Sequence, residues 1–218
     1  MKGKSYMKRS WTVPAIIAAI VVVVGMLLAA SYNGLVSSRE TVRGSINNVQ
    51  TQYQRRADLI PTLVQTVKGD ANFEKTTLEA VVSARAKATS ITIDPSKATP
   101  EQLQQYQNAQ GELSQALGRL IAVSENYPEL KATQAFRDLM TQLEGTENRI
   151  QIARADYGKT VQAYNAKIQR FPTNISAGLF GFSQFPYFAA DKGAETAPKV
   201  DFTPDKNCTA DNCAIRNQ

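Results

Sequence analysis

The first part of the chain is strongly apolar. No charged residue occurs between positions 10 and 38, and every residue of Trp11–Ala30 except Thr12 is apolar. About 20 such residues span the hydrocarbon core of a bilayer as an α-helix. Pro14 falls in the first turn, where its missing N–H costs least. The pattern predicts a transmembrane helix over residues 11–31.

A cleavable signal peptide is the alternative interpretation of this segment. A basic N-terminal region precedes the apolar run, and Ala29-Ala30-Ser31 offers small residues for cleavage. We favour a retained anchor, because the apolar run continues into a helical pattern at Tyr32 with no helix breaker between them. Trp11 and Tyr32 bracket the span as interfacial aromatic residues do.

After the span, apolar residues recur at alternating steps of four and three, as on a helix packed lengthwise against others. The series is Leu35, Arg39, Val42, Ile46, Val49, Tyr53, Arg56, Ile60, Leu63 and Val67. Pro61 lies inside this stripe, so a kink or a break is expected just before it.

A second stripe with the same spacing extends over 36 residues, from Phe136 to Phe171. It comprises Phe136, Met140, Leu143, Glu147, Ile150, Arg154, Tyr157, Val161, Tyr164, Ile168 and Phe171. Pro172 is expected to end it. The intervening chain predicts two shorter helices, over 73–88 with Leu78, Val81 and Val82, and from Thr99 onward with Leu103, Tyr106, Leu113, Leu117, Leu120 and Ile121. The predicted fold class is all-α, with the transmembrane helix continuous with an elongated antiparallel bundle of about four helices.

Five regions follow from these patterns: a basic N-terminal tail (1–10), the transmembrane helix (11–31), the bundle (32–172), an aromatic segment (173–190) and a tail (191–218). The tail is too poor in apolar residues to order itself. The aromatic segment, with Phe180, Phe182 and Phe185, either folds back to cap the bundle or forms an exposed docking surface for a partner, a second copy or the bilayer.

Composition narrows the possible chemistry. Histidine is absent, which removes Ser-His-Asp and Cys-His nucleophile systems and most general bases that work near neutral pH. Cys208 and Cys213 are too few for a disulfide framework or a four-cysteine metal site. We therefore expect no enzyme, no cofactor, no bound metal and no small-molecule substrate.

The chain has 25 basic and 19 acidic residues, but four of the basic ones lie in the first nine positions, so the remainder is nearly neutral. A nucleic-acid binder would carry its basic residues on the folded domain, so we expect no nucleic-acid partner.

The charges on either side of the span predict its orientation. The four basic residues before it are Lys2, Lys4, Lys8 and Arg9, whereas Arg39 and Arg43 follow it. The positive-inside rule therefore predicts a cytoplasmic N-terminus and an exported bundle.

Four charges occupy positions inside the two stripes: Arg39, Arg56, Glu147 and Arg154. An unpaired buried ion costs several kcal/mol. Either these residues pair with one another and fix the register of the helices, or they form a polar site for a ligand or partner.

Several ordered motifs resemble the LemA family of bacterial membrane-anchored proteins. They are Tyr32-Asn33-x-Leu35-Val36-x-x-Arg39, Gln52-x-x-Arg55-Arg56-x-Asp58-Leu59-Ile60-Pro61, Ala84-Arg85-Ala86, Glu125-x-Tyr127-Pro128, Thr146-Glu147-Asn148-Arg149-Ile150, Ala153-Arg154-x-x-Tyr157 and Phe171-Pro172-x-Asn174. The resemblance implies an N-terminal membrane helix, a long-helix bundle and no established enzymatic activity. It also implies a bundle in the cytosol, which opposes the charge count.

Together these observations predict a single-pass protein of the bacterial cytoplasmic membrane that acts as a non-catalytic scaffold or adaptor. Its partner would be a second copy or another membrane protein, for instance an envelope quality-control protease. The alternative is a ligand sensor or hydrolase that uses Glu147 or Glu125 with Arg39, Arg56 or Arg154. The interaction candidates are Arg39, Arg56, Asp58, Pro61, Glu125, Tyr127, Pro128, Glu147, Asn148, Arg154, Tyr157, Phe180, Phe182 and Phe185.

Overall fold

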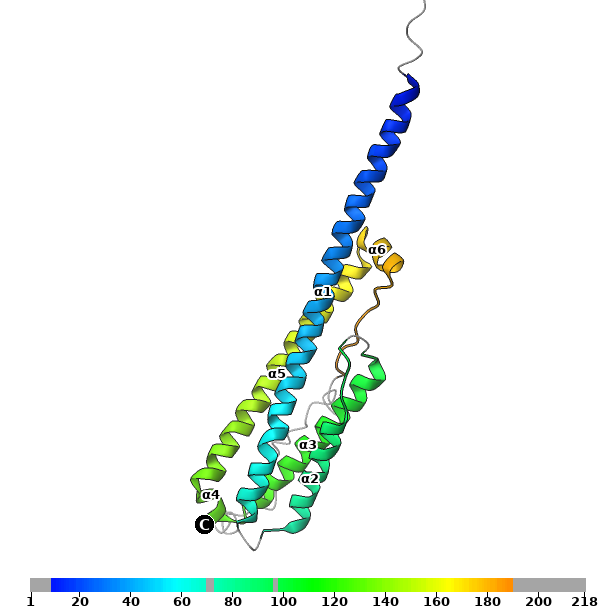
Figure 1. Ribbon diagram of the computed structural model, residues 1–218. Coiled ribbons are helices and arrows are strands. Elements are labelled where there is room, and N and C mark those ends of the chain that lie inside the picture. The colour runs from blue at the N-terminus through cyan, green and yellow to red at the C-terminus, as the bar shows by residue number, and fades with distance from the viewer. Residues whose placement is uncertain (1–8, 70–72, 96–97, 190–218) are drawn as a thin grey trace, which may run out of the picture. The chain divides into compact units, whose positions relative to one another are not determined.

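A computed structural model describes residues 9–69, 73–95 and 98–189. Every regular element within these ranges is a helix (Figure 1). The order is α1 (Arg9–Lys68), α2 (Lys75–Ser90), α3 (Pro100–Ser124), α4 (Pro128–Ala132), α5 (Gln134–Gln169) and α6 (Thr173–Phe180). The all-α prediction is confirmed. The tail over 191–218, with both cysteines, lies outside the described residues.

The apolar helix predicted to cross the membrane and the first bundle helix are one element. α1 runs for 60 residues without interruption, so the small residues around Ala30 lie inside a continuous helix. From Val13 to Leu27 its side chains are exposed. Among the helices of the described residues, α1 alone is long and apolar enough to cross a membrane.

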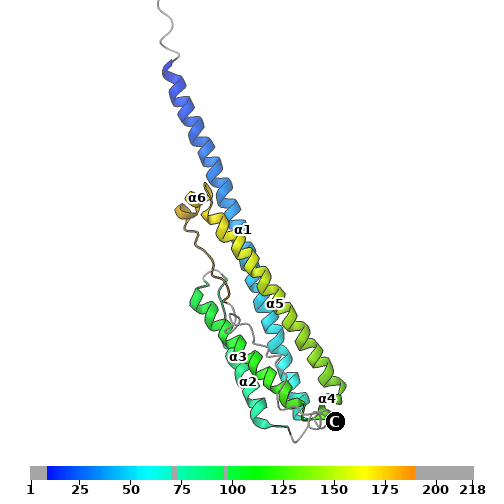
Figure 2. The same ribbon diagram turned by 180° about the vertical axis from the view of Figure 1, so that it is seen from behind.

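The bundle is built from two antiparallel pairs (Figures 1 and 2). α1 and α5 pack along their length, with Ser45 bonded to Thr160 at 2.8 Å and Arg56 bonded to Glu147 at 2.9 Å, so residue numbers rise along one helix as they fall along the other. α2 and α3 form a hairpin that packs on this pair.

The two stripes form the core. All eight apolar members of the first stripe are buried, from Leu35 to Val67. In the second stripe, Phe136, Leu143, Ile150, Tyr157, Val161, Tyr164 and Ile168 are also buried. The buried residues separate into two clusters along the bundle axis, one around Tyr157 near the span and one around Leu63 near the far end.

Three predicted core positions are wrong. Phe171 is 80% exposed because α5 ends at Gln169, before the stripe does. Ile121 and Val82 are 41% and 49% exposed. Each adjoins a position that is buried instead, Leu120 and Val81, so these two helices turn the neighbouring residue to the core.

The expected helix break at Pro61 does not occur. α1 continues through Pro61 to Lys68. Pro61 has no N–H to donate to the carbonyl of Ala57 four residues earlier. That carbonyl instead accepts from Arg85 Nε of α2 at 2.8 Å, so the hairpin supplies the missing donor.

The boundaries of α3 and α4 follow local capping. Thr99 accepts from the backbone N–H of Gln102, and the Gln102 side chain accepts from the backbone N–H of Thr99, which completes the predicted capping box. The turn predicted at Asn126-Tyr127-Pro128 leads into α4, with Pro128 in its first turn.

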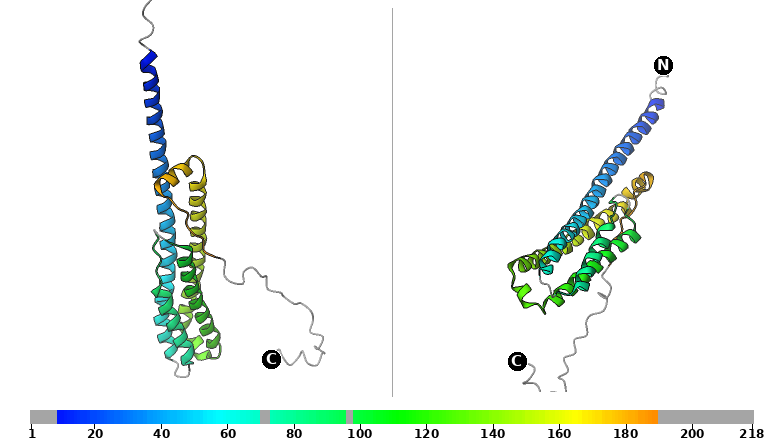
Figure 3. Two further views of the ribbon diagram at one scale, coloured as in Figure 1. Left: turned by 90° about the vertical axis from the view of Figure 1, so that its right-hand side faces the viewer. Right: turned by 60° about the horizontal axis from the view of Figure 1, so that its bottom comes forward.

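From Phe182 onward the aromatic segment folds back onto the bundle, as one of the two alternatives predicted, whereas Phe180 is 47% exposed. After the short helix α6, the chain turns at Gly181, whose φ of 70° suits glycine, and continues without regular structure to Ala189. Phe182, Phe185 and Phe188 pack against the core cluster near the span. Figure 3 shows this segment beside α1 and α5.

Candidate functional site

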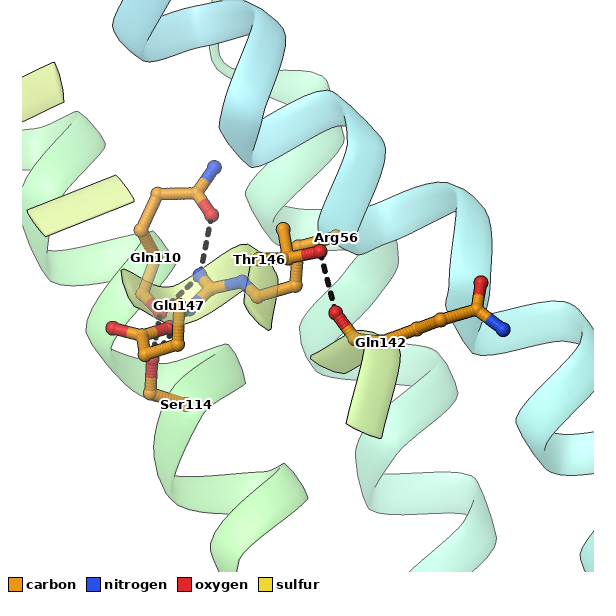
Figure 4. A network of polar contacts seen from close by, with 6 residues as sticks. All are labelled: Arg56, Gln110, Ser114, Gln142, Thr146 and Glu147. Carbon is orange, nitrogen blue, oxygen red and sulfur yellow. Dashed lines mark hydrogen bonds and ion pairs between the residues drawn. The ribbon is translucent and has the colours of Figure 1, made fainter. Parts of the chain in front are cut away.

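Arg56 is the most conspicuous polar feature of the bundle. It is 2% exposed, and among the described residues it is the one charged residue that is buried. It projects from α1 towards α3 and α5 (Figure 4). Nη1 donates to Ser114 Oγ at 2.8 Å and to Glu147 Oε2 at 2.9 Å. Nη2 donates to the backbone oxygen of Gln110 at 3.1 Å and to its Oε1 at 2.8 Å.

These contacts form a polar layer, which we define as Arg56, Gln110, Ser114 and Glu147. The layer lies between the two core clusters, because Tyr53 and Ile150 belong to the cluster on one side, and Ile60 and Leu143 to the cluster on the other. Gln110 extends it by donating to the backbone oxygen of Ala88 at 3.2 Å, which ties α2 to α3. A polar layer inside an apolar bundle specifies helix register, since a slipped register would leave its groups unpaired.

The geometry of the layer leaves Arg56 little capacity for a ligand. Four of the five guanidinium N–H groups are engaged, and the guanidinium carbon lies 5.1 Å from the centroid of the Tyr53 ring. The Glu147 side chain is 46% exposed, so water reaches the carboxylate from one side. The pair is therefore buried at its arginine and solvated at its glutamate.

A small pocket lies beside the layer, lined by Gln50, Gln54, Ala57, Thr89, Thr92 and Tyr106 among others. Burial raises the pKa of Tyr106, the neighbouring Tyr53 adds to that rise, and Arg56 opposes it. Tyr106 therefore stays protonated at neutral pH and is unsuited to act as a general base.

Arg39 and Arg154 do not share the environment of Arg56. The prediction that the stripe charges pair with one another is confirmed for Arg56 with Glu147. Arg39 instead lies 3.8 Å from Glu40, outside the stripe, and both Arg39 and Arg154 are half-buried. Their guanidinium carbons lie 5.0 Å from the Phe182 ring and 5.2 Å from the Phe188 ring. The returning aromatic segment covers this face of α1 and α5, and cation–π contact replaces the packed helix expected there.

A second polar constellation fixes the aromatic segment. Asn165 of α5 donates from Nδ2 to the backbone oxygen of Phe185 at 2.9 Å and accepts from its backbone N–H at 3.0 Å. The Tyr157 hydroxyl donates to the backbone oxygen of Pro186 at 2.8 Å. Burial, followed by the nearby phenol of Tyr187, raises the pKa of Tyr157 to about 12. These contacts satisfy backbone groups that no helix or sheet pairs.

The remaining predicted residues do not join the polar layer. Glu125 lies exposed at the end of α3 and pairs with Lys131, so its proposed role beside the arginines is wrong. Tyr127 packs on Phe73 with ring centroids 4.9 Å apart. Asp58 is exposed and accepts from Gln54 at 2.7 Å. Asn148 and Pro128 are exposed.

The candidate residues predicted from the sequence omit four that the structure uses, Gln110, Ser114, Asn165 and Arg85, although Arg85 lies in the Ala84-Arg85-Ala86 motif of the family resemblance. Gln110 and Asn165 interrupt apolar helix faces, next to Leu113 and Tyr164. A polar residue on an otherwise apolar helix face was the signal in the sequence that could have identified these two residues. Within the described residues, no group of three or more His, Cys, Asp or Glu side chains could hold a metal ion.

Comparison with known proteins agrees with the motifs. Residues 45–202 match the model of the LemA family. Magnetosome protein MamQ 2 of Paramagnetospirillum magneticum is 27% identical over 190 residues, covering 78% of this chain and 68% of that protein. Magnetosome protein MamQ of Magnetospirillum gryphiswaldense is 25% identical over the same coverage. Protein LemA of Metamycoplasma hominis is 26% identical over 160 residues, covering 73% of this chain and 69% of that protein.

Proposed function

This chain belongs to the LemA family, and we propose that it acts as a single-pass, membrane-anchored, non-catalytic scaffold or adaptor. Its bundle would self-associate or bind another membrane protein, with an envelope quality-control protease as one partner class. The names of its relatives, magnetosome protein and protein LemA, specify no reaction.

The polar layer is the observation that carries this proposal. In a scaffold, buried charges fix the register of the helices. In a sensor or hydrolase, the charged side chains must be accessible to a ligand. Arg56 is buried and joins α1 to α3 and α5, which supports the first role. Glu147 and Ser114 reach solvent, but the Glu147 carboxylate is already paired with Arg56 at 2.9 Å.

The long exposed surface of the bundle offers the means of binding. α5 is 36 residues long, and its outward face carries polar and charged side chains over most of that length. Such a face suits a polar, reversible protein contact better than a buried obligate one.

A pull-down with two differently tagged full-length copies tests the scaffold role. The copies are expressed together, extracted in mild detergent and captured through one tag, and the second tag and co-purified membrane proteins are quantified. We expect a second copy or a membrane protein in stoichiometric amount. Recovery of a single copy with neither contradicts the proposal.

Glu147→Gln supplies the control that separates the two functions. It keeps the size of the side chain and one acceptor oxygen but removes the charge. A scaffold should retain its partner in this variant once folding is verified by circular dichroism. Loss of partner recovery in a folded Glu147→Gln protein would favour a ligand site at the layer.

For localisation we propose the bacterial cytoplasmic membrane, with the bundle outside the cytoplasm. The basic residues of the N-terminal tail support this orientation through the positive-inside rule, and two cysteines in one tail suit an oxidising compartment. A membrane-impermeant thiol reagent should then label reduced Cys208 and Cys213 in intact spheroplasts. Labelling that occurs only after lysis would place the bundle in the cytosol.

A further inference from the structure

α6 exposes apolar side chains that the bundle does not use. Ala177 faces the core and is 4% exposed, but Ile175, Leu179 and Phe180 are 57%, 68% and 47% exposed. Phe171, two residues before α6, is 80% exposed. We call Phe171, Ile175, Leu179 and Phe180 the α6 patch. Four large apolar side chains gathered on one short segment mark a contact surface.

The position of the α6 patch beside the apolar span indicates that lipid covers it. The Phe180 ring lies 4.9 Å from the ring of Tyr32, the residue that follows the apolar span. Phe180 also shares a shallow pocket with Gly25, Leu28 and Ala29, which belong to the span itself. Figures 1 and 3 show α6 beside α1 at this point. Through Phe180, the patch therefore adjoins the apolar surface of the span.

Contacts made by residues before and after α6 hold this helix beside the turns of α1 that follow the span. Lys167, near the end of α5, donates from Nζ to the backbone oxygen of Gly34 at 2.6 Å and to Ser38 Oγ at 2.8 Å. Tyr32 contacts Phe182 as well, with ring centroids 5.8 Å apart. α6 is thereby fixed on both sides to the first turns of α1 beyond the span.

The chemistry of the segment suits the boundary between headgroups and acyl chains. Aromatic rings are enriched at that depth, and apolar side chains of interfacial helices enter it by about 5–10 Å. Arg170, exposed between α5 and Phe171, places a cation at headgroup level.

We propose that the α6 patch inserts into the membrane leaflet from which α1 emerges. The inference rests on the proposed membrane anchoring and adds a second attachment to it. A single helix lets the bundle swing about the span, whereas contact through both α1 and α6 fixes its tilt and presents a constant face of α5 to a partner.

Fluorescence quenching in vesicles tests the proposal on the full-length protein. Cys208→Ser and Cys213→Ser remove the native thiols, and single cysteines are placed by Leu179→Cys in the patch, Val21→Cys in the span and Gln142→Cys at the far end of α5. Each is labelled with an environment-sensitive fluorophore and reconstituted into phosphatidylcholine–phosphatidylglycerol vesicles that carry nitroxide lipids. Ile175→Cys repeats the patch measurement at an independent exposed site.

We expect nitroxides placed near the headgroups to remove about half of the fluorescence at positions 179 and 175, as for an interfacial helix. Acyl-chain nitroxides should quench the label at position 21, and neither should affect the label at 142. Quenching at 21 with none at 179 and 175 overturns the insertion of α6 and leaves the anchor intact. Absence of quenching at 21 overturns the anchor itself.

A second copy of the chain could cover the patch instead of lipid. In that case the label at 179 would resist the nitroxides and would self-quench as the ratio of protein to lipid rises. That result overturns the proposal in favour of dimerisation through α6.

Discussion

Arg85 Nε donates to the backbone oxygen of Ala57 at 2.8 Å, and Ala57 is the residue whose helical partner would be the N–H of residue 61. Because residue 61 is proline, that carbonyl has no donor within α1. A side chain from α2 therefore completes the hydrogen bonding of α1 and joins the hairpin to the membrane helix.

This relationship predicts coupling between the two sites. Arg85→Ala should lower the free energy of unfolding by about 1–2 kcal/mol, since it leaves the carbonyl of the buried Ala57 unpaired. In a Pro61→Ala background, the restored N–H of residue 61 can donate to the Ala57 carbonyl. Arg85→Ala should then lower the free energy of unfolding by clearly less. Urea denaturation of the full chain in detergent, followed by circular dichroism, measures both. Additive effects of the two substitutions would show that the proline and the arginine are independent.

Arg56→Ala should be more costly, by about 3 kcal/mol, because it removes a buried charge that serves three helices. Arg55→Ala is the matched control, since Arg55 is exposed on the adjacent position of the same turn. It should change stability by less than about 0.5 kcal/mol. Equal sensitivity at the two positions would contradict the role of the polar layer.

Alkaline pH should weaken the attachment of the aromatic segment. The pKa of Tyr157 is raised to about 12 in the folded chain, against an ordinary value near 10. Between these values the unfolded state releases the proton and the folded state retains it, so stability is fully present below about pH 10 and falls as pH approaches about 12.

Tyr157→Phe should therefore show a shallower loss of stability over the same interval, measured by urea denaturation at each pH. The variant should also be less stable at neutral pH by about 1 kcal/mol, because the hydrogen bond to the Pro186 oxygen is lost. A pH dependence identical to that of the unmodified chain would assign the alkaline loss to other groups.

Asn165→Leu should release the aromatic segment without unfolding the bundle. It removes both hydrogen bonds to the backbone of Phe185 and leaves that N–H and carbonyl oxygen to find water. Hydrogen exchange followed by mass spectrometry should quicken over residues 182–188 and remain unchanged in α3. Asn174→Leu, at an exposed position of α6, is the control. Unchanged exchange in the Asn165 variant would mean that the phenylalanine rings alone hold the segment.

The helices and their buried faces could be predicted because spacing along one helix determines them. The stripe from Leu35 to Val67 and the capping box at Thr99 depend on residues close in sequence. The continuity of α1 through Pro61 could not be predicted in this way, since it depends on Arg85, more than twenty residues away in another helix.

The residues of the candidate site could likewise be predicted only in part from the sequence. Arg56 and Glu147 were recognisable as charges within apolar stripes, but their spacing could not reveal that Gln110 and Ser114 of α3 complete the layer. Arg39 had the same signal as Arg56. Arg39 lies against Phe182 of the returning segment, whereas Arg56 meets Gln110 and Ser114 of α3, and helical periodicity does not encode which segment packs at each position.

If the uncleaved first part of α1 holds this protein in the membrane, the intact mass of the chain after an alkaline carbonate wash of the membranes will show it. Because α1 continues from the apolar span into the bundle, the protein should remain in the pellet with the mass of the full 218-residue chain, 23.9 kDa. Release into the wash with a mature N-terminus near Tyr32 would contradict the claim and restore the signal peptide.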